Sequence, residues 1–80
     1  MDISILAFGI VKEFFGGPAI AWELQGERTV ARLKEELEAA YPDMKKLRSY
    51  LVAVNDEYAE DGLVIRPGDE IAIIPPVSGG

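Results

Sequence analysis

The fold of this chain is decided by one stretch of sequence, Thr29-Val30-Ala31-Arg32-Leu33-Lys34-Glu35-Glu36-Leu37-Glu38-Ala39-Ala40-Tyr41-Pro42. Its apolar residues recur at helical spacing and form one stripe: Val30, Leu33, Leu37 and Tyr41. This periodicity predicts one main helix over about residues 29–41. Thr29 suits the N-cap position, because its hydroxyl can accept a hydrogen bond from a backbone N–H of the first turn. Pro42 then ends the helix.

The opposite face of this helix carries charged side chains. Arg32 and Glu36 are spaced for an ion pair, and so are Lys34 and Glu38. With the basic residue first, each pair contributes only about a few tenths of a kcal/mol. We therefore expect a solvated surface with little structural role.

Short apolar segments that predict strands lie on both sides of the helix. Before it stand Ile3–Phe8 and Ala19–Leu24, separated by a possible helical turn over Val11–Phe15 and by the breaker Gly16-Gly17-Pro18. After it come Leu51–Val54, a brief return over Glu57–Ala59, and Glu70–Ile74. This order predicts an α+β fold of the β-grasp type, in which a mixed sheet packs on one helix and the first and last strands lie side by side in parallel. We expect one domain over residues 1–74 and a flexible, extended tail over residues 75–80.

Composition excludes several classes of function. The chain has 80 residues, a net charge of −6, no cysteine and no histidine. Nucleic acid is an unsuitable partner, because phosphate binding needs a basic surface. The common nucleophile–base pairs and cysteine-based metal sites cannot be built. No apolar run approaches the roughly 20 residues of a membrane span, and the first residues lack the basic start of a secretory signal. We expect a cytoplasmic domain that contacts no membrane and holds no metal.

The last ten residues, Ile71–Gly80, contain the one reactive group that the composition leaves as a candidate. A strand runs into Pro75-Pro76 and then into Val77-Ser78-Gly79-Gly80. The two prolines favour an extended, semi-rigid exit from the sheet. A carboxylate on Gly80 is ionised at neutral pH and can attack an activated phosphate, which would turn it into an acyl donor. Glycine has no Cβ, so a narrow channel can admit it. The sequence therefore predicts that Gly80 is the reactive group.

The same segments resemble a known family. Leu51-Val52-Ala53-Val54-Asn55 and the run from Pro67-Gly68-Asp69-Glu70 to Pro75-Pro76-Val77-Ser78-Gly79-Gly80 are similar to the small subunits of molybdopterin synthase, in the MoaD/ThiS family of sulfur carriers. Leu6-Ala7-Phe8, Val11-Lys12-Glu13 and the start of the helix at Thr29 also fit. The resemblance spans nearly the whole chain and implies a ubiquitin-like β-grasp.

The resemblance also implies a reaction. An E1-like (MoeB-like) enzyme would adenylate Gly80 at the cost of ATP, and a sulfur donor protein would convert it to a thiocarboxylate. The tail would then enter the active site of a MoaE-like large subunit, where its sulfur goes to cyclic pyranopterin monophosphate in molybdenum cofactor biosynthesis. The family assembles as a heterotetramer. The chain would bind no cofactor and act as the non-catalytic subunit of a sulfurtransferase complex, with the catalytic side chains on the large subunit.

The resemblance also implies which residues form the functional site. Gly80 is the sulfur acceptor and donor, and the expected partner-binding residues are Ile74, Pro75, Pro76, Val77, Ser78 and Gly79. Alternation along the last strand predicts that Ile71 and Ile73 face the helix and that Ile74 faces the other side. Ile74 is then either ordinary core or part of an apolar docking surface. Trp22 is assigned to the core, and Phe8 is left open between the two.

Two other functions stay open on the sequence. One is a ThiS-like carrier for thiamine synthesis, which is disfavoured because such chains are usually shorter and lack Pro-Pro before the tail. The other is a ubiquitin-like modifier or binding module whose Gly80 is joined to lysines or never activated.

Overall fold

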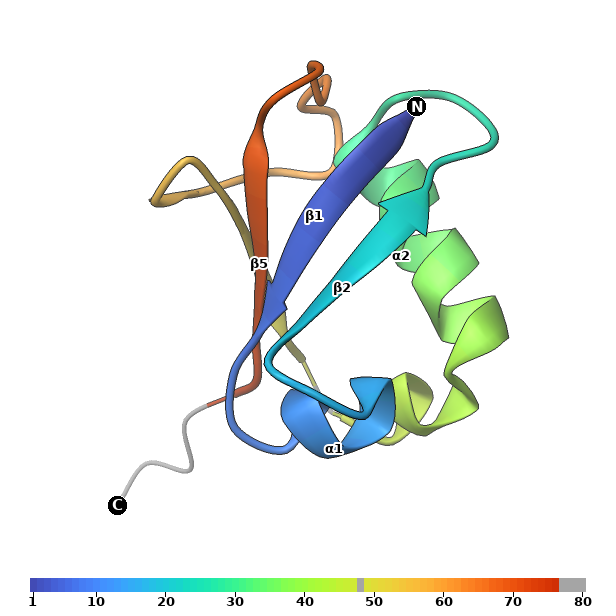
Figure 1. Ribbon diagram of the computed structural model, residues 1–80, viewed down its shortest axis with the longest axis vertical. Coiled ribbons are helices and arrows are strands. Elements are labelled where there is room, and N and C mark those ends of the chain that lie inside the picture. The colour runs from blue at the N-terminus through green and yellow to red at the C-terminus, as the bar shows by residue number, and fades with distance from the viewer. Residues whose placement is uncertain (48, 77–80) are drawn as a thin grey trace.

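The computed structural model describes residues 1–47 and 49–76 and shows two layers, a mixed five-stranded sheet with one long helix against one face (Figure 1). The strand order is β2-β1-β5-β3-β4. The strands are β1 (Asp2–Ala7), β2 (Ala19–Glu23), β3 (Leu51–Val54), β4 (Glu57–Tyr58) and β5 (Glu70–Ile74). The helical elements are α1 (Val11–Phe15), α2 (Val30–Ala40) and a 3-10 helix, η1 (Pro42–Lys46). The predicted α+β architecture is confirmed.

The first and last strands form the centre of the sheet. β1 and β5 run parallel, with Ile5 opposite Ile71 and Ala7 opposite Ile73, and all four side chains are buried. β2 and β3 flank this pair antiparallel. The predicted parallel pairing is therefore confirmed. β5 is the middle strand of the sheet, and its C-terminal end lies on the same side of the molecule as α1 (Figure 1).

Helix α2 forms as its sequence predicts. The Thr29 hydroxyl oxygen accepts from the Arg32 N–H at 3.2 Å, which satisfies one donor of the first turn. Val30, Leu33 and Leu37 are fully buried against the sheet. Complete burial of such a side chain stabilises the fold by about 1.5–3 kcal/mol. The helix ends at Ala40, and Tyr41 separates it from η1, which begins at Pro42.

The chain turns away from the sheet one residue earlier than predicted. β1 ends at Ala7, and Phe8 already belongs to the connection, because its carbonyl accepts from the Val11 N–H at 3.1 Å. The expected helical turn at Val11–Phe15 is α1, which buries Val11 and Phe15. No helix in the described ranges is long and apolar enough to cross a membrane.

Candidate docking face and the end of the last strand

The sheet face that points away from α2 carries apolar side chains from neighbouring strands. We call it the outer face and define it by the side chains that share it in register: Leu6, Ala19, Ala21, Leu51, Ala53, Tyr58, Ala72 and Ile74. Leu51 lies opposite Ile74, and Leu51 remains 46% exposed. Ala53 is buried, and the other members of the outer face are partly or fully exposed. A contiguous apolar surface of this kind is typical of a protein interaction site.

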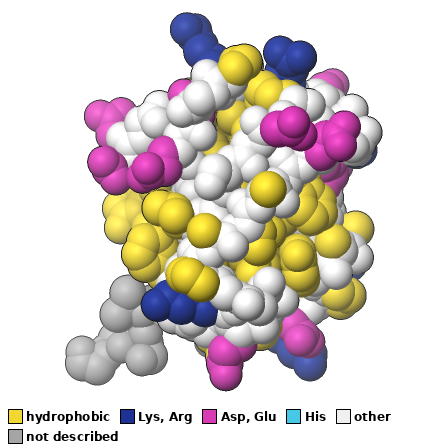
Figure 2. Space-filling model, in the orientation of Figure 1, with side chains coloured by type: hydrophobic (Ala, Val, Ile, Leu, Met, Phe, Trp, Pro, Cys, Tyr) yellow, Lys and Arg dark blue, Asp and Glu magenta, His cyan; other side chains and the backbone are white. Residues whose placement is uncertain are grey.

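Charge changes along the outer face in one direction. Outward side chains of β1 change from Asp2 at its start to Leu6 near its end. Those of β5 change from Glu70 to Ile74. Glu23 of β2 lies opposite Asp2, so acidic groups meet at the end where β1 and β5 begin. In Figure 2, hydrophobic side chains gather over the middle and lower part of the visible face, and acidic ones lie mainly in its upper part, below the Lys and Arg side chains at the top of the molecule. A partner that fits this face would be apolar near the end of β5 and basic at the far end.

The structure settles where Ile74 lies. Ile71 and Ile73 are fully buried against α2, whereas Ile74 is half-buried on the outer face, as the alternation predicts. Ile74 is therefore not ordinary core, and its role in docking stays a prediction. Phe8 is 45% exposed in the connection after β1. Trp22 is half-buried and packs against the core, in line with its assignment.

The predicted tail is described only at its start. Pro75 is half-buried and Pro76 is exposed. Val77, Ser78, Gly79 and Gly80 lie outside the described residues, so their predicted roles are untested. Sequence reasoning missed Leu51 and Tyr58 as members of the outer face. Leu51 opens a strand that is apolar throughout, and Tyr58 follows the exposed Glu57, so no alternation marks either residue in the sequence. Only the register shows that they adjoin Ile74 and Ala53.

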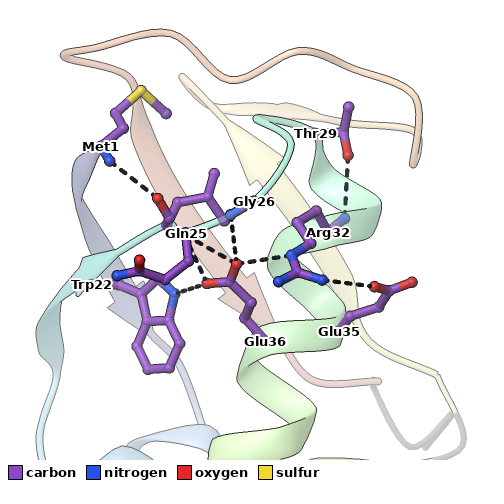
Figure 3. A network of polar contacts seen from close by, with 9 residues as sticks. Met1, Trp22, Gln25, Gly26, Thr29, Arg32, Glu35 and Glu36 are labelled. Atoms are coloured by element: carbon purple, nitrogen blue, oxygen red, sulfur yellow. Dashed lines mark hydrogen bonds and ion pairs between the residues drawn. The ribbon is translucent and has the colours of Figure 1, made fainter.

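On the other side of the molecule, a polar network centres on Glu36 (Figure 3). Its carboxylate accepts from Trp22 Nε1 at 3.0 Å and from the backbone N–H groups of Gln25 and Gly26, each at 3.1 Å. Arg32 Nε donates to the same group at 2.9 Å. The Glu36 side chain is only 10% exposed. The expectation of a solvated helix surface is therefore wrong at Glu36, because the β2–α2 connection folds over it.

This environment determines the charge of Glu36. Burial raises the pKa of its carboxyl group, but the hydrogen bonds from Trp22, Gln25, Arg32 and Gly26 outweigh burial and hold that pKa below its usual value. Glu36 is thus ionised at neutral pH and fully engaged with donors of its own chain. Its role is to hold α2 to the connection that follows β2.

The expected ion pair of Arg32 with Glu36 forms, but Lys34 has a different partner from the expected Glu38. Lys34 Nζ pairs with Asp61 Oδ1 at 2.7 Å, and Glu38 accepts from the Tyr50 hydroxyl at 2.6 Å. Burial and the neighbouring Glu38 carboxylate raise the pKa of Tyr50. Within residues 1–47 and 49–76, no three acidic side chains cluster closely enough to hold a metal ion.

Comparison with known proteins identifies relatives along the whole chain. The model of the ThiS family matches residues 5–80. The molybdopterin synthase sulfur carrier subunit of Dictyostelium discoideum is 44% identical over 83 residues, which cover 99% of this chain and 96% of the relative. SAMP1 from Haloferax volcanii is 27% identical, with a TM-score of 0.81 and complete coverage of both chains.

A structural neighbour has also been solved together with its partner. It belongs to the complex of subunits 1 and 2 of the molybdopterin-converting factor from Helicobacter pylori. This neighbour is 22% identical, with a TM-score of 0.71 and complete coverage of both chains. At this identity the likeness shows that the two chains share a fold.

Proposed function

This chain belongs to the ThiS family, and from that premise we propose that it is the sulfur carrier subunit of a molybdopterin synthase, with Gly80 as the group that carries sulfur. Support comes from relatives that bear this name and match nearly the full length of the chain. The single structural observation that carries the proposal is the outer face, which is apolar beside the end of β5 and therefore beside the start of the segment that leads to Gly80.

The proposed chemistry begins at the Gly80 carboxylate. An oxygen of this carboxylate attacks the α-phosphorus of ATP in an E1-like enzyme, and pyrophosphate leaves. A persulfide sulfur of a donor protein then attacks the acyl carbon of the adenylate and displaces AMP, which gives an acyl disulfide. A thiol reduces the S–S bond of this disulfide, so that the donor is released and a thiocarboxylate remains on Gly80. These ATP-dependent steps take place in the cytoplasm. The chain itself binds no cofactor in this scheme.

Sulfur is then delivered at a partner's active site. The thiocarboxylate enters a MoaE-like large subunit and passes its sulfur to cyclic pyranopterin monophosphate. A dithiolene contains two sulfur atoms, and each carrier supplies one, so one product needs two carriers. The chain contains neither histidine nor cysteine. General acids and bases for the transfer are therefore expected on the large subunit.

The proposal is tested by intact mass. Incubation with the activating enzyme, ATP and a sulfur source should increase the mass of the chain by about 16 Da, because one carboxylate oxygen is exchanged for sulfur. The same mixture without ATP is the control. An unchanged mass under conditions that load a known carrier would refute the sulfur-carrier function. Conjugates to lysine would support a ubiquitin-like modifier instead.

The docking role of the outer face gives a second test. Replacing Ile74 with Lys should weaken binding to the large subunit by on the order of 10–100-fold, because a charge would be buried in the apolar part of the interface. Thermal stability should change little, since a half-buried lysine can extend its ammonium group into water. Binding can be measured by calorimetry and stability by thermal melting.

Val64→Lys is the matched control for Ile74→Lys. Val64 is 57% exposed and bridges to Thr29 at the start of α2, away from the outer face. Its replacement should leave binding unchanged. The docking role would be refuted if Ile74→Lys unfolded much of the protein and the remaining folded molecules bound the large subunit with wild-type affinity.

A further inference from the structure

The connection after β1 touches the chain just after β5. The parallel register ends with Ala7 opposite Ile73, and beyond it the turn at Gly9 lies against Pro75. Pro75 has no N–H, so the ladder cannot continue through it. Instead its ring packs against the backbone of Gly9. A Cβ placed on Gly9 would lie 2.9 Å from Pro75 Cγ, a separation that real Cβ atoms essentially never show.

Gly9 meets two requirements at once. Its φ is +55°, a conformation that residues with a side chain adopt only at a cost in energy. Its missing side chain leaves the space that the Pro75 ring uses. Among the described residues, Gly16 and Gly68 share a positive φ, but a Cβ on either would meet nothing within 4 Å. Of the glycines in residues 1–47 and 49–76, Gly9 alone combines a positive φ with close packing.

The backbone on both sides of Gly9 is fixed by burial and hydrogen bonds. The connection is three residues long and lies between Ala7 and Val11, both of which are buried. Val11 N–H donates to the Phe8 carbonyl at 3.1 Å, and Lys12 N–H donates to the Gly9 carbonyl at 3.2 Å. A short segment fixed at both ends and bonded into the first turn of α1 has little freedom to yield to an added atom.

We propose that Gly9 is a positioning residue for sulfur transfer: its bare backbone holds the Pro75 ring and so fixes the direction in which the chain leaves β5. The inference rests on the proposed function of Gly80. Pro75 and Pro76 both have φ fixed near −65°, so the direction set at Pro75 is carried on to Pro76. A partner that docks on the outer face then meets the departing chain at a defined angle.

Gly9→Ala tests this proposal, with Gly16→Ala as the matched control. Both substitutions place a side chain at a positive φ, but only the first adds an atom against Pro75. We expect Gly9→Ala to lower kcat/KM for thiocarboxylate formation by about tenfold or more, since a displacement of about 1 Å can cost on the order of 100-fold in rate. Gly16→Ala should stay within about twofold under the same folded conditions.

Removal of the ring should rescue the defect. In a Pro75→Ala background no Cγ is present, so adding Gly9→Ala should lower the rate by less than about twofold. A purely structural role for Gly9 would give the same loss in both backgrounds. An equal loss with and without the ring, or an equal loss for Gly9→Ala and Gly16→Ala, would overturn the proposal.

A second readout does not depend on sulfur chemistry. In the wild-type chain and in Gly16→Ala, NMR should show an NOE between the Gly9 α-protons and the Pro75 ring protons, and in Gly9→Ala the contact should be lost. Its absence in the wild type would overturn the proposal. If the wild-type chain took up no sulfur while the NOE behaved as expected, the proposed function would fall, and with it the role in transfer. The NOE would then support only the packing of Pro75 on Gly9, without a role in sulfur transfer.

Discussion

Deletion of Gly80 is expected to abolish sulfur uptake and to leave the free energy of unfolding within about 0.5 kcal/mol of the wild-type value. The truncated chain still has a glycine carboxylate, on Gly79, but it reaches about 3.3–3.6 Å less far. Reacting atoms must approach to about 3–3.5 Å in the correct orientation, so a shortfall of one residue removes the carboxylate from the reactive position. Stability should be retained because the buried residues of β5, Ile71 and Ile73, precede the tail.

Intact mass measures sulfur uptake by the truncated chain, and thermal melting measures its stability. Gly80→Ala is the control that keeps the length and adds only a Cβ, and it should take up more sulfur than the truncated chain, because its carboxylate still reaches the reactive position. Normal uptake by the truncated chain would show that Gly80 is not the sulfur acceptor. A large loss of stability on truncation would contradict the predicted division between a domain at residues 1–74 and a tail at residues 75–80.

Features with a local signal were predictable from the sequence. Val30, Leu33 and Leu37 follow the period of a helix, and that period alone assigns the buried face of α2. Ile71 and Ile73 alternate with Ala72 and Ile74, and the period of a strand places them on opposite faces. The order of strands and helix then leaves few arrangements, which is why the parallel pairing of β1 and β5 could be predicted.

Features that depend on strand register or on contacts between segments distant in the sequence could not be predicted. The neighbourhood of Leu51 and Ile74 requires the pairing of β3 with β5, and the contact of Gly9 with Pro75 requires the pairing of β1 with β5. Gly9 looks like any glycine that ends a strand. Glu36 looks like any exposed acidic residue of an amphipathic helix, because the donors that surround it belong to the connection after β2.

Replacing Glu36 with Gln is expected to lower the free energy of unfolding at pH 7 by about 2–3 kcal/mol, since hydrogen bonds to a charged acceptor contribute about 1.5–3 kcal/mol and several share this carboxylate. Gln25 and Gly26 N–H, Trp22 Nε1 and Arg32 Nε all donate to it. A neutral amide offers these donors one weaker acceptor oxygen and an NH2 group that repels them. Chemical denaturation at pH 7 measures the loss. Glu35→Gln is the matched control, because the Glu35 side chain is 71% exposed and lies 3.6 Å from Arg32.

The same network predicts how stability depends on pH. The pKa of Glu36 is lowered in the folded chain relative to its unfolded value of 4.5. The unfolded state therefore binds this proton at a higher pH than the folded state, and the contribution of the ionised carboxylate is lost as the pH falls below about 4.5. The difference in stability between the wild type and Glu36→Gln should consequently be constant from pH 7 down to about pH 5 and shrink in more acid solution. A difference that did not change with pH would mean that the carboxylate contributes through its shape and packing and not through its charge.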